Sequence, residues 1–559
     1  MVLAAALLCS TGTAFSGTQD AAGRKKAGAL VPSKAKTSTE GDYNIIFITT
    51  DQERYFKIPP AETNWRARDL LQSVGATFEK HYISSNMSTS SRSVIYTGQH
   101  ITGTKMSDNT DMPWQSALRE DISTIGDLMR EAGYYTAYTG KFHMLKEGAV
   151  EIPGSNAEES GQDKIKLQRQ DDLEIYGFSN WNTEGDIAGG VLDGYHSDEF
   201  IKGSAVRWLR DKGISLNKSG VPFFLAVNFI NPHDIMYFNP GGSQAALHTN
   251  AAPGNTVYAQ QYDYLPPAWE YTPAERSGIP AHREYQAMWS KMTGALARSE
   301  EALKQYNDYY LNCIQDQDNS LMGLLEELKR LGMMENTIII YTSDHGEMGG
   351  SHGLTGKGNF IYESNLHVPF IVVHPSYKRS QRIGAVTSHL DITPTILDMT
   401  NLSDDKKKRL TKGLAGHSLV PLLDGRVKSV RSGALYANSQ ISTLDACYDP
   451  FAGAGSPDFN KRGMLRGIVT ERYKFGRYFS PLDFHMPASL DELYNKNDVE
   501  LYDLENDPHE LHNLAANREA NACLIEKMNR QLNELILREI GADNGSEIAD
   551  ALAYFGTKR

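Results

Sequence analysis

The chain has 559 residues, of which 40% are hydrophobic and 22% are charged, so it can bury a large core and is not intrinsically disordered. It carries 56 Lys and Arg against 69 Asp and Glu, a formal net charge of -13, and an acidic surface repels a phosphate backbone, which argues against non-specific nucleic-acid binding. Its four cysteines are too few and too scattered for a disulfide framework or a C-x-x-C metal site. No stretch reaches about eighteen uninterrupted apolar residues, so the sequence predicts no membrane span.

Residues 1–42 are predicted to be a leader that precedes the fold. Residues 2–8 (VLAAALL) form a short apolar run followed by small and polar residues, which resembles the later part of a secretory signal peptide, although the usual basic residues before it are missing. The remainder is rich in Gly, Ala, Ser, Thr and Lys without periodicity, as in a flexible segment. The leader favours a periplasmic or secreted protein, with a cytoplasmic one as the alternative.

From residue 43 onward, short apolar β-prone runs alternate with helical patterns, as a parallel sheet covered by helices requires. Buried strands are predicted at 44–49, 134–138, 222–229 and 337–341, and helices at 121–132, 197–209 and 299–331. Two stretches without a clear period, 146–195 and 236–296, are predicted to be insertions above the sheet, where insertions commonly shape a pocket. Residues 43–414 are therefore predicted to form an α/β domain with a large mixed, mostly parallel sheet sandwiched by helices.

The pattern changes after about residue 415. Shorter β-like runs at 433–436, 466–470 and 473–478 are followed by a closing helical pattern at 518–540. We expect residues 415–559 to form a smaller C-terminal α+β domain.

Polar side chains follow four of the predicted strands, at the point where each strand ends. They are Asp51 and Gln52, Lys141 and His143, His233 and Asp234, and Asp344 and His345. A single His after a strand is usually an ordinary loop residue. However, loops that leave the carboxyl ends of strands in an open α/β sheet converge on one edge, so four such strands together predict a functional site.

Three of these side chains suit a metal ion. Asp51, Gln52 and Asp344 offer two carboxylates and an amide oxygen, which are the ligands that hard divalent cations prefer. The sequence therefore predicts one metal ion, with Ca²⁺ favoured and Mg²⁺ as the alternative. His345 either completes the metal shell or contacts the substrate. Zinc is less favoured, because neither cysteine ligands nor an H-E-x-x-H pattern is present.

The segment 88–98 (STSSRSVIYTG) has the layout of a nucleophile at a helix N-terminus. Backbone N–H groups and the helix dipole favour an anion at that position, and Arg92 can reach an oxyanion with fixed geometry. On this segment alone, a serine-rich capping loop is an equal alternative to a site built on Ser88.

Several motifs in order resemble those of the type I sulfatases of the alkaline phosphatase superfamily, from about residue 43 to 515. They are NIIFITTDQ (44–52), STSSRSVIYTG (88–98), GKFH (140–143), NPHD (231–234), SDHGEMGGSHGLTGKGNFIYE (343–363), HVPFIV (367–372), DITPTILD (391–398) and ELYDLENDPHELHNLA (500–515). Independent motifs in one order are far more specific than any single one. The resemblance implies an alkaline phosphatase-like fold and hydrolysis of sulfate esters.

The resemblance also implies a role for each residue of the site. Residue 88 would be the position of formylglycine, made from cysteine or, in some bacterial members, from serine by a formylglycine-generating or serine-type maturating enzyme. It would attack sulfur in line beside the metal. The metal ligands would be Asp51, Gln52, Asp344, His345 and Ser88 itself.

The remaining implied roles concern charge and proton transfer. Arg92, Lys141 and Lys357 would neutralise sulfate oxygens in the transition state. His233, with Lys357, would protonate the leaving oxygen, and His143 would be the base that releases sulfate and regenerates the aldehyde. His352, in the same loop as Lys357, is expected to contact the substrate.

Two positions depart from the family pattern. Residue 88 is serine rather than the commoner cysteine, and residue 90 is serine where proline or alanine is usual. Ser88 is therefore interpreted in three ways: as matured to formylglycine, as an engineered replacement of cysteine that traps substrate, or as a direct nucleophile in a phosphate mono- or diester hydrolase. A protein that binds sulfated ligands without turnover is a further alternative. The complete Lys141, His143, His233 and Lys357 set favours the sulfatase.

The substrate is expected to be a sulfated molecule, and a carbohydrate is preferred over a small aryl sulfate or choline sulfate. The reason is that Trp181, Trp269 and Trp289 and many tyrosines lie in the two predicted insertions, where aromatic rings can stack on sugars. Oligomeric state leaves no motif in the sequence.

Overall fold

The computed structural model describes residues 43–146, 173–183, 190–240, 257–271, 278–377, 380–450 and 455–557. The predicted leader and parts of both predicted insertions lie outside these ranges. Within them, no helix has the length and apolar character needed to cross a bilayer. All of these residues belong to one compact unit that spans 36–559.

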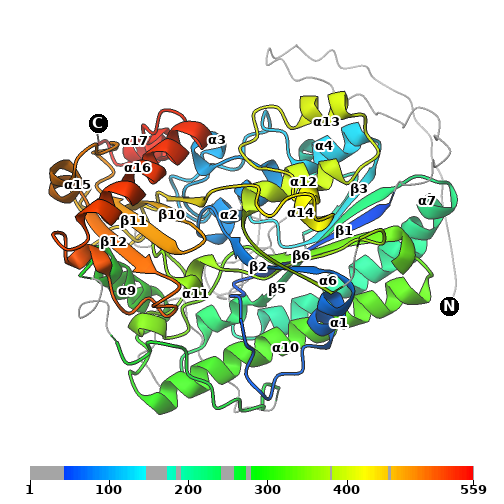
Figure 1. Cartoon of the computed structure of the whole chain (residues 1–559). Coiled ribbons are helices and arrows are strands. Elements are labelled where there is room, and N and C mark those ends of the chain that lie inside the picture. The colour runs from blue at the N-terminus through cyan, green and yellow to red at the C-terminus, as the bar shows by residue number, and fades with distance from the viewer. Residues whose placement is uncertain are drawn as a thin grey trace, which may run out of the picture. The chain divides into compact units, whose positions relative to one another are not determined.

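A mixed sheet of eight strands forms the centre of this unit (Figure 1). The strands are β1 (Asn44–Asp51), β2 (Ala76–Tyr82), β3 (Tyr135–Gly140), β4 (Asn180–Asn182), β5 (Phe223–Pro232), β6 (Thr337–Ser343), β7 (Phe370–Val373) and β8 (Gln381–Ser388). Their order is β4-β3-β5-β1-β6-β7-β2-β8. Among the described strands, β7 runs antiparallel to both of its neighbours, and the other pairs are parallel.

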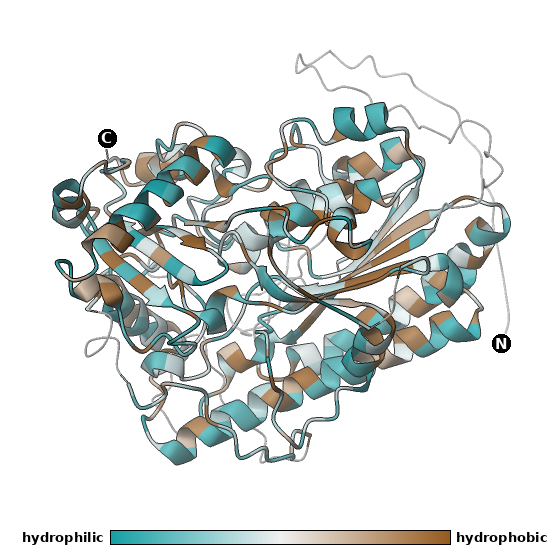
Figure 2. Cartoon of the chain, in the orientation of Figure 1, coloured by the Kyte–Doolittle hydropathy of each residue, from teal (hydrophilic) through white to brown (hydrophobic). Residues whose placement is uncertain are grey.

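Strand β1 explains why the sheet carries helices on both faces. Its eight residues are all buried. Because side chains alternate between the two faces of a strand, both faces of the sheet must be covered to bury them all. Ile45 and Phe47 pack into a core that includes residues of α2 (Ser88–Thr97), α4 (Ile125–Ala132) and α12 (Ile392–Asp398). Ile46 and Ile48 pack into a second core that includes residues of α1 (Arg66–Val74), α6 (Asp193–Trp208) and α10 (Glu300–Arg330). Figure 2 shows brown, hydrophobic stretches in the central strands of the large sheet, next to helices that are largely teal.

The helices lie close to their predicted positions. Predicted helices 121–132, 197–209 and 299–331 correspond to α4, α6 and α10, and Ser299 caps α10 by accepting a hydrogen bond from the backbone of Ala302. The helices are α1 (Arg66–Val74), α2 (Ser88–Thr97), α3 (Ile101–Thr104), α4 (Ile125–Ala132), α6 (Asp193–Trp208), α7 (Ile214–Lys218), α9 (Pro280–Thr293), α10 (Glu300–Arg330), α11 (Glu363–Leu366), α12 (Ile392–Asp398), α13 (Asp404–Leu410), α14 (Val420–Leu423), α15 (Leu490–Lys496), α16 (Ala522–Glu539) and α17 (Ala549–Tyr554).

A second, antiparallel sheet follows in the C-terminal part of the chain, with the order β12-β11-β10-β9. Its strands are β9 (Ala434–Asn438), β10 (Met464–Val469), β11 (Tyr473–Phe479) and β12 (Asp498–Asp503). Tyr436 and Leu465 of this sheet share a hydrophobic core with Tyr82 of the large sheet. The predicted fold class is therefore confirmed, whereas the boundary at 414/415 stays a prediction.

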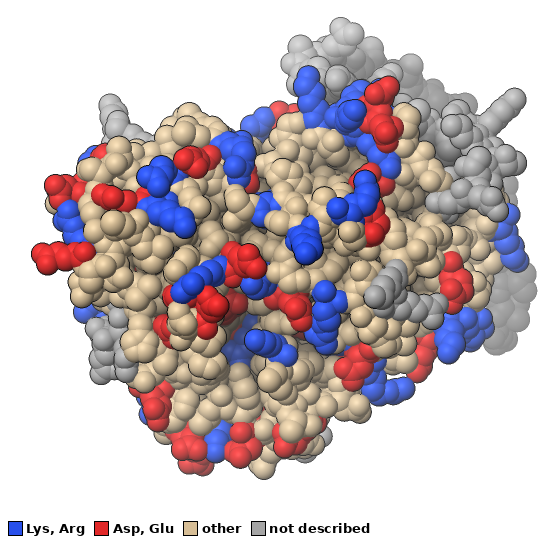
Figure 3. All heavy atoms as spheres, viewed as in Figure 1, with Lys and Arg blue, Asp and Glu red and all other residues tan. Residues whose placement is uncertain are grey.

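The charged side chains do not segregate by sign on the face shown in Figure 3. Lys and Arg lie interspersed with Asp and Glu there. The net charge of -13 therefore says little about the sign of a ligand, which depends on the local groups of the site.

Candidate active site

The four strands that carry the predicted polar residues are consecutive in the sheet, in the order β3-β5-β1-β6. Asp51 ends β1, Lys141 follows β3, His233 follows β5, and Asp344 follows β6. Parallel strands present their carboxyl ends at one edge, so these side chains converge. The ammonium group of Lys141, for example, lies 2.9 Å from Oδ2 of Asp51.

Ser88 lies at the centre of this edge as the first residue of α2. Its hydroxyl donates to the Asp51 carboxylate at 3.2 and 3.3 Å and lies 3.0 Å from Nε2 of His345. Lys357 donates to the same hydroxyl at 3.2 Å. All four side chains are buried, so the oxygen of residue 88 faces a carboxylate, an imidazole and an ammonium group at once.

Helix α2 adds a fixed positive potential at this point. It has ten residues, and the preceding residue, Met87, is extended and provides no side-chain cap. The amide groups of the first turn and the positive end of the helix dipole are therefore next to residue 88. This arrangement favours an anionic oxygen there.

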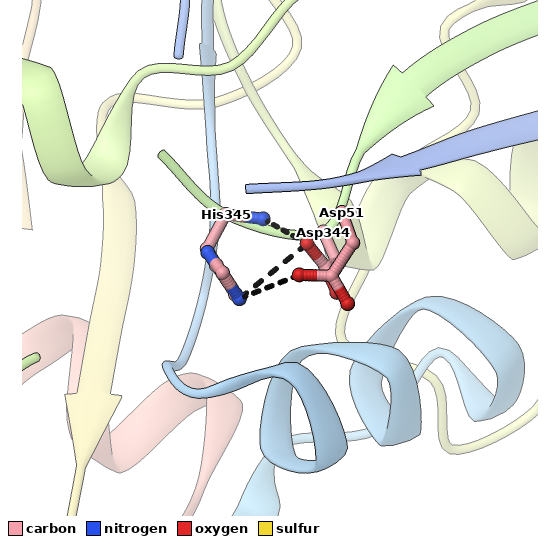
Figure 4. Close-up of side chains that lie close together, drawn as sticks. All are labelled: Asp51, Asp344 and His345. Atoms are coloured by element: carbon pink, nitrogen blue, oxygen red, sulfur yellow. Dashed lines mark hydrogen bonds and ion pairs between the residues drawn. The ribbon is translucent and has the colours of Figure 1, made fainter. Parts of the chain in front are cut away.

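Asp51, Asp344 and His345 form a group that could hold a metal ion, since each offers a ligand atom and these atoms lie within 4.8 Å of one another. Nε2 of His345 is 3.5 Å from Oδ1 of Asp51 and 3.5 Å from Oδ1 of Asp344 (Figure 4). Burial, and then the charge of Asp51, raise the pKa of Asp344 to about 6. Two buried carboxylates that repel each other in this way are stabilised by a shared cation.

The side-chain oxygen of Gln52 is available to a cation. The side-chain nitrogen of this residue donates to Oε2 of Glu347 at 2.5 Å, while its buried side-chain oxygen has no hydrogen-bond partner among the described residues. Nδ1 of His345 lies 3.1 Å from the carbonyl of Gly346. A carbonyl only accepts hydrogen bonds, so it places the proton of the neutral ring on Nδ1, and Nε2 keeps a lone pair that can bind a cation. Two carboxylates, an unpartnered amide oxygen and an imidazole nitrogen fit a divalent cation.

Arg92 is committed to the carboxylates and to a backbone carbonyl. Its guanidinium donates to Oδ2 of Asp344 at 3.0 Å, to Oδ2 of Asp51 at 3.3 Å and to the carbonyl of Lys141 at 2.7 Å. Burial by itself would raise the pKa of Asp51, but Lys141, Lys357 and other nearby cations hold that pKa well below its usual value. Asp51 is therefore ionised, and Arg92 fixes its orientation.

The two candidate proton carriers, His143 and His233, flank this group. The carbonyl of His143 accepts a hydrogen bond from the Thr89 hydroxyl at 2.7 Å, and its Nε2 lies 3.7 Å from Oδ2 of Asp111. His233 follows β5, and burial, then the charges of Lys141 and Lys357, hold its pKa well below the usual value. Without a bound anion, His233 is therefore neutral at pH 7.

The sequence GKFH begins with a glycine for a geometric reason. Gly140 has a φ of 96°, and a Cβ on it would lie 1.9 Å from the carbonyl oxygen of Asn228 in the neighbouring strand β5. Only glycine lets β3 turn this close to β5. The turn delivers Lys141 and His143 to the site.

Two of the predicted residues lie in other surroundings. The ring of His352 stacks on Tyr362 with centroids 3.8 Å apart, and no hydrogen bond joins it to Ser88 among the described residues. Trp289 is buried, and a Cβ on Gly356 would lie 2.3 Å from its indole ring. Trp289 therefore packs beneath the loop that carries Lys357 and is not a platform for sugar rings. Trp181 and Trp269 are half-buried.

Three further side chains contact the site and were not predicted. Glu347 receives the Gln52 side chain, Tyr306 donates to Glu347 at 3.2 Å, and Tyr310 donates to the backbone carbonyl of Gln52 at 2.8 Å. The position of Glu347, three residues after Asp344, is the one signal of it in the sequence. The two tyrosines belong to a helical stripe that also serves the core.

Comparison with known proteins identifies the family. Residues 43–402 match the Sulfatase family, and residues 350–538 match the family "N-sulphoglucosamine sulphohydrolase, C-terminal". An endo-4-O-sulfatase of Bacteroides thetaiotaomicron is 25% identical over 483 residues, which cover 81% of this chain and 81% of that protein.

Solved structures share the fold. A 2-O GAG sulfatase has a TM-score of 0.64 at 20% identity and covers 89% of this chain and 92% of its own. A phosphonate monoester hydrolase from Silicibacter pomeroyi has a TM-score of 0.64 at 20% identity, with coverages of 91% and 97%. A protein solved with its substrate, D-glucosamine-2-N,6-O-disulfate, has a TM-score of 0.58 at 20% identity, with coverages of 90% and 99%. Because the family match spans more than half of the sequence, this chain belongs to the sulfatase family of hydrolases.

Proposed function

We propose that this sulfatase hydrolyses sulfate esters of a carbohydrate and that residue 88 is the attacking group. The observation that carries the proposal is the position of Ser88, whose hydroxyl contacts Asp51, His345 and Lys357 at the N-terminus of α2. A nucleophilic oxygen needs an activating neighbour and a cationic environment for the charge that develops. The substrate of the related solved structure, a sulfated glucosamine, supports a sulfated glycan.

A divalent cation would be held by Asp51, Gln52, Asp344 and His345, with residue 88 as a further ligand. Ca²⁺ is the preferred ion and Mg²⁺ the alternative, because the donors are mainly oxygen. When bound, the cation would act as a Lewis acid for the attacking oxygen and for the sulfate oxygens.

In the proposed first step, the hydroxyl of residue 88 passes its proton to the Asp51 carboxylate, which already accepts its hydrogen bond, and its oxygen forms a bond to sulfur while the bond between sulfur and the substrate oxygen breaks. The released oxygen takes a proton from His233, with Lys357 beside it. While the site is without an anion, His233 is a neutral imidazole and therefore a poor acid, since its pKa is low. The negative charge of a bound sulfate would raise that pKa and so charge the acid only when substrate is present.

The cationic side chains divide between two tasks. Lys141 and Lys357 would stabilise the sulfate oxygens as charge moves onto them. Arg92 was expected to do the same, and its Nε and Nη2 atoms also donate to Asp344 and Asp51. We propose that Arg92 holds these carboxylates in place.

Release of sulfate depends on the chemical state of residue 88. A hydrated aldehyde at this position supplies a second hydroxyl, which an unmodified serine lacks. His143 would remove the proton of that hydroxyl, and the bond from carbon to the sulfate oxygen would break with its electron pair leaving on sulfate. Ser88 is fully buried in the folded chain, so a maturating enzyme would reach it before folding.

Phosphate-ester hydrolysis is the second candidate. The fold similarity to the phosphonate monoester hydrolase supports it, because the same cations suit a phosphoryl group. In this case the enzyme would turn over an aryl phosphate or a phosphodiester faster than the matching aryl sulfate.

Mass spectrometry of the peptide that carries residue 88, together with paired assays, tests the proposal. We expect the wild-type protein to show the loss of two hydrogens at Ser88 and to hydrolyse an aryl sulfate and sulfated oligosaccharides faster than an aryl phosphate. An unmodified, inactive wild-type protein that still binds sulfated sugars would be a binding protein. Faster turnover of the phosphate would establish the second candidate.

A further inference from the structure

The carboxylate of Glu347 accepts hydrogen bonds from four groups in or beside the site. It is fully buried in the loop after β6. Its Oε1 accepts from the backbone of Gly349 at 2.8 Å, from the backbone of Gly356 at 2.8 Å and from the Tyr306 hydroxyl at 3.2 Å. Its Oε2 accepts from the side-chain nitrogen of Gln52 at 2.5 Å. Oε1 thus binds the backbone of the loop and Tyr306, whereas Oε2 binds Gln52.

The contact at Oε2 decides the orientation of the Gln52 carboxamide. An ionised carboxylate can only accept hydrogen bonds, so it must face the NH₂ end of the amide. The oxygen of Gln52 then points away from Glu347, and it is buried without a hydrogen-bond partner among the described residues. An amide in the opposite orientation would present NH₂ to the cation, which is repulsive.

The backbone of Gln52 is held as well. The Tyr310 hydroxyl donates to the carbonyl of Gln52 at 2.8 Å and accepts from the backbone of Arg54 at 3.0 Å. Gln52 has a φ of 75°, a left-handed conformation that non-glycine residues adopt at a cost. Tyr306 and Tyr310, one turn apart on α10, therefore support Glu347 and Gln52 together.

We propose that Glu347 is a positioning residue that fixes which atom of Gln52 faces the cation, and that its other oxygen fixes the backbone beside Lys357. The inference rests on the proposed metal site. Glu347 is not one of the proposed metal ligands, and it would act through its hydrogen bond with Gln52. A metal ligand that can rotate freely binds less tightly, and loss of such an orienting partner typically weakens metal affinity 10–100-fold.

Two variants isolate the contact at Oε2. Glu347→Gln has nearly the same shape, and its remaining oxygen can still accept from Gly349, Gly356 and Tyr306. Its NH₂ group, however, meets the NH₂ group of Gln52. The double variant Gln52→Glu with Glu347→Gln reverses donor and acceptor, so that residue 347 donates to a carboxylate at residue 52. The net charge is unchanged in the double variant.

The measurement is Ca²⁺ binding by titration calorimetry on chelator-treated full-length protein, with the melting temperature of the metal-free proteins as the folding control. We expect Glu347→Gln to weaken Ca²⁺ binding about 10–100-fold. The double variant should bind Ca²⁺ at least as tightly as wild type, because it has a third carboxylate ligand, and more tightly than Gln52→Glu alone, in which residues 52 and 347 would be two facing carboxylates. A merely structural role would lower the melting temperature of the metal-free protein, and Glu347→Gln would then weaken Ca²⁺ binding in the Gln52→Glu background as well.

Wild-type affinity in Glu347→Gln would overturn the inference, and so would a folded double variant that stays as weak as the single one. If the single variant does not fold, the comparison of the double variant with Gln52→Glu decides. Asp344→Asn tests the metal site itself. If wild type binds neither Ca²⁺ nor Mg²⁺, or if Asp344→Asn binds them as tightly as wild type, the proposed metal site is wrong; if only the Glu347 result fails, the metal site stands.

Discussion

The ammonium group of Lys357 donates a hydrogen bond to the Ser88 hydroxyl at 3.2 Å, although 269 positions separate the two residues. Both side chains are buried. Ser88 reaches this point because it begins α2, and Lys357 because the loop after β6 folds back over the sheet edge. The contact places a fixed positive charge beside the proposed nucleophile.

Removal of this charge tests its role in catalysis. Lys357→Ala is expected to lower kcat on an aryl sulfate about 10²–10³-fold, the usual effect of losing one donor aimed at developing negative charge. Lys428→Ala, at an exposed position, is the matched control and should keep wild-type kcat. A change of less than about threefold in Lys357→Ala would remove Lys357 from the mechanism.

Gly140 is predicted to be irreplaceable, and Gly133 provides a control with the same φ angle. Both residues have a φ of 96°, but a Cβ on Gly140 would lie 1.9 Å from the Asn228 carbonyl oxygen, whereas a Cβ on Gly133 would meet nothing within 4 Å. Gly133→Ala should cost about 1–2 kcal/mol of unfolding free energy from backbone strain and keep its kcat. Gly140→Ala should cost more and also lower kcat, because Lys141 moves. Denaturant unfolding and steady-state kinetics measure both effects, and equal results for the two variants would contradict the prediction.

Ser90 is expected to be a source of instability. Its hydroxyl is buried without a hydrogen-bond partner among the described residues, which costs about 1–3 kcal/mol. Ser90→Ala should therefore raise the free energy of unfolding by about 1 kcal/mol. Ser93 is the matched control on the same helix, because its hydroxyl donates to the Ser90 carbonyl at 2.7 Å, and Ser93→Ala should be destabilising. A loss of stability in Ser90→Ala, measured by urea denaturation, would show that its hydroxyl has a partner.

Glu500 is predicted to make stability fall as pH rises. Burial raises its pKa from 4.5 to about 7, and the hydroxyls of Tyr478 and Tyr502 donate to its carboxyl oxygens. The folded protein thus binds a proton that the unfolded chain loses above pH 4.5. This stabilisation is complete below pH 4.5 and disappears as pH rises through 7.

Glu500→Gln removes this dependence because the amide does not ionise. The unfolding free energy of the variant, relative to wild type, should rise by about 2–3 kcal/mol between pH 5 and pH 8. Urea denaturation of both proteins at the two pH values provides the comparison. A constant difference would mean that Glu500 keeps an ordinary pKa in the folded protein.

The sequence by itself was enough for the fold class, for four strands of the large sheet and for the edge at which they end. Continuous apolar runs such as 44–49 predict buried strands, because a parallel strand covered on both faces has no solvent side. The position of Asp51, Lys141, His233 and Asp344 at strand ends then predicts one edge, since the carboxyl ends of parallel strands meet. These are local or topological rules that need no coordinates.

Only the tertiary structure decided which atoms face each other. The guanidinium of Arg92 lies between Asp51 and Asp344, a placement that the sequence did not predict, and its contact with sulfate stays a prediction. Trp289 was a candidate for sugar stacking, but it is buried against Gly356. The position of Glu347, three residues after Asp344, pointed to the site, but its hydrogen bond with Gln52 was not predictable. The physical reason is that strand order brings residues to an edge, whereas hydrogen-bond partners depend on side-chain rotamers and on loops from distant segments, which no periodicity or spacing encodes.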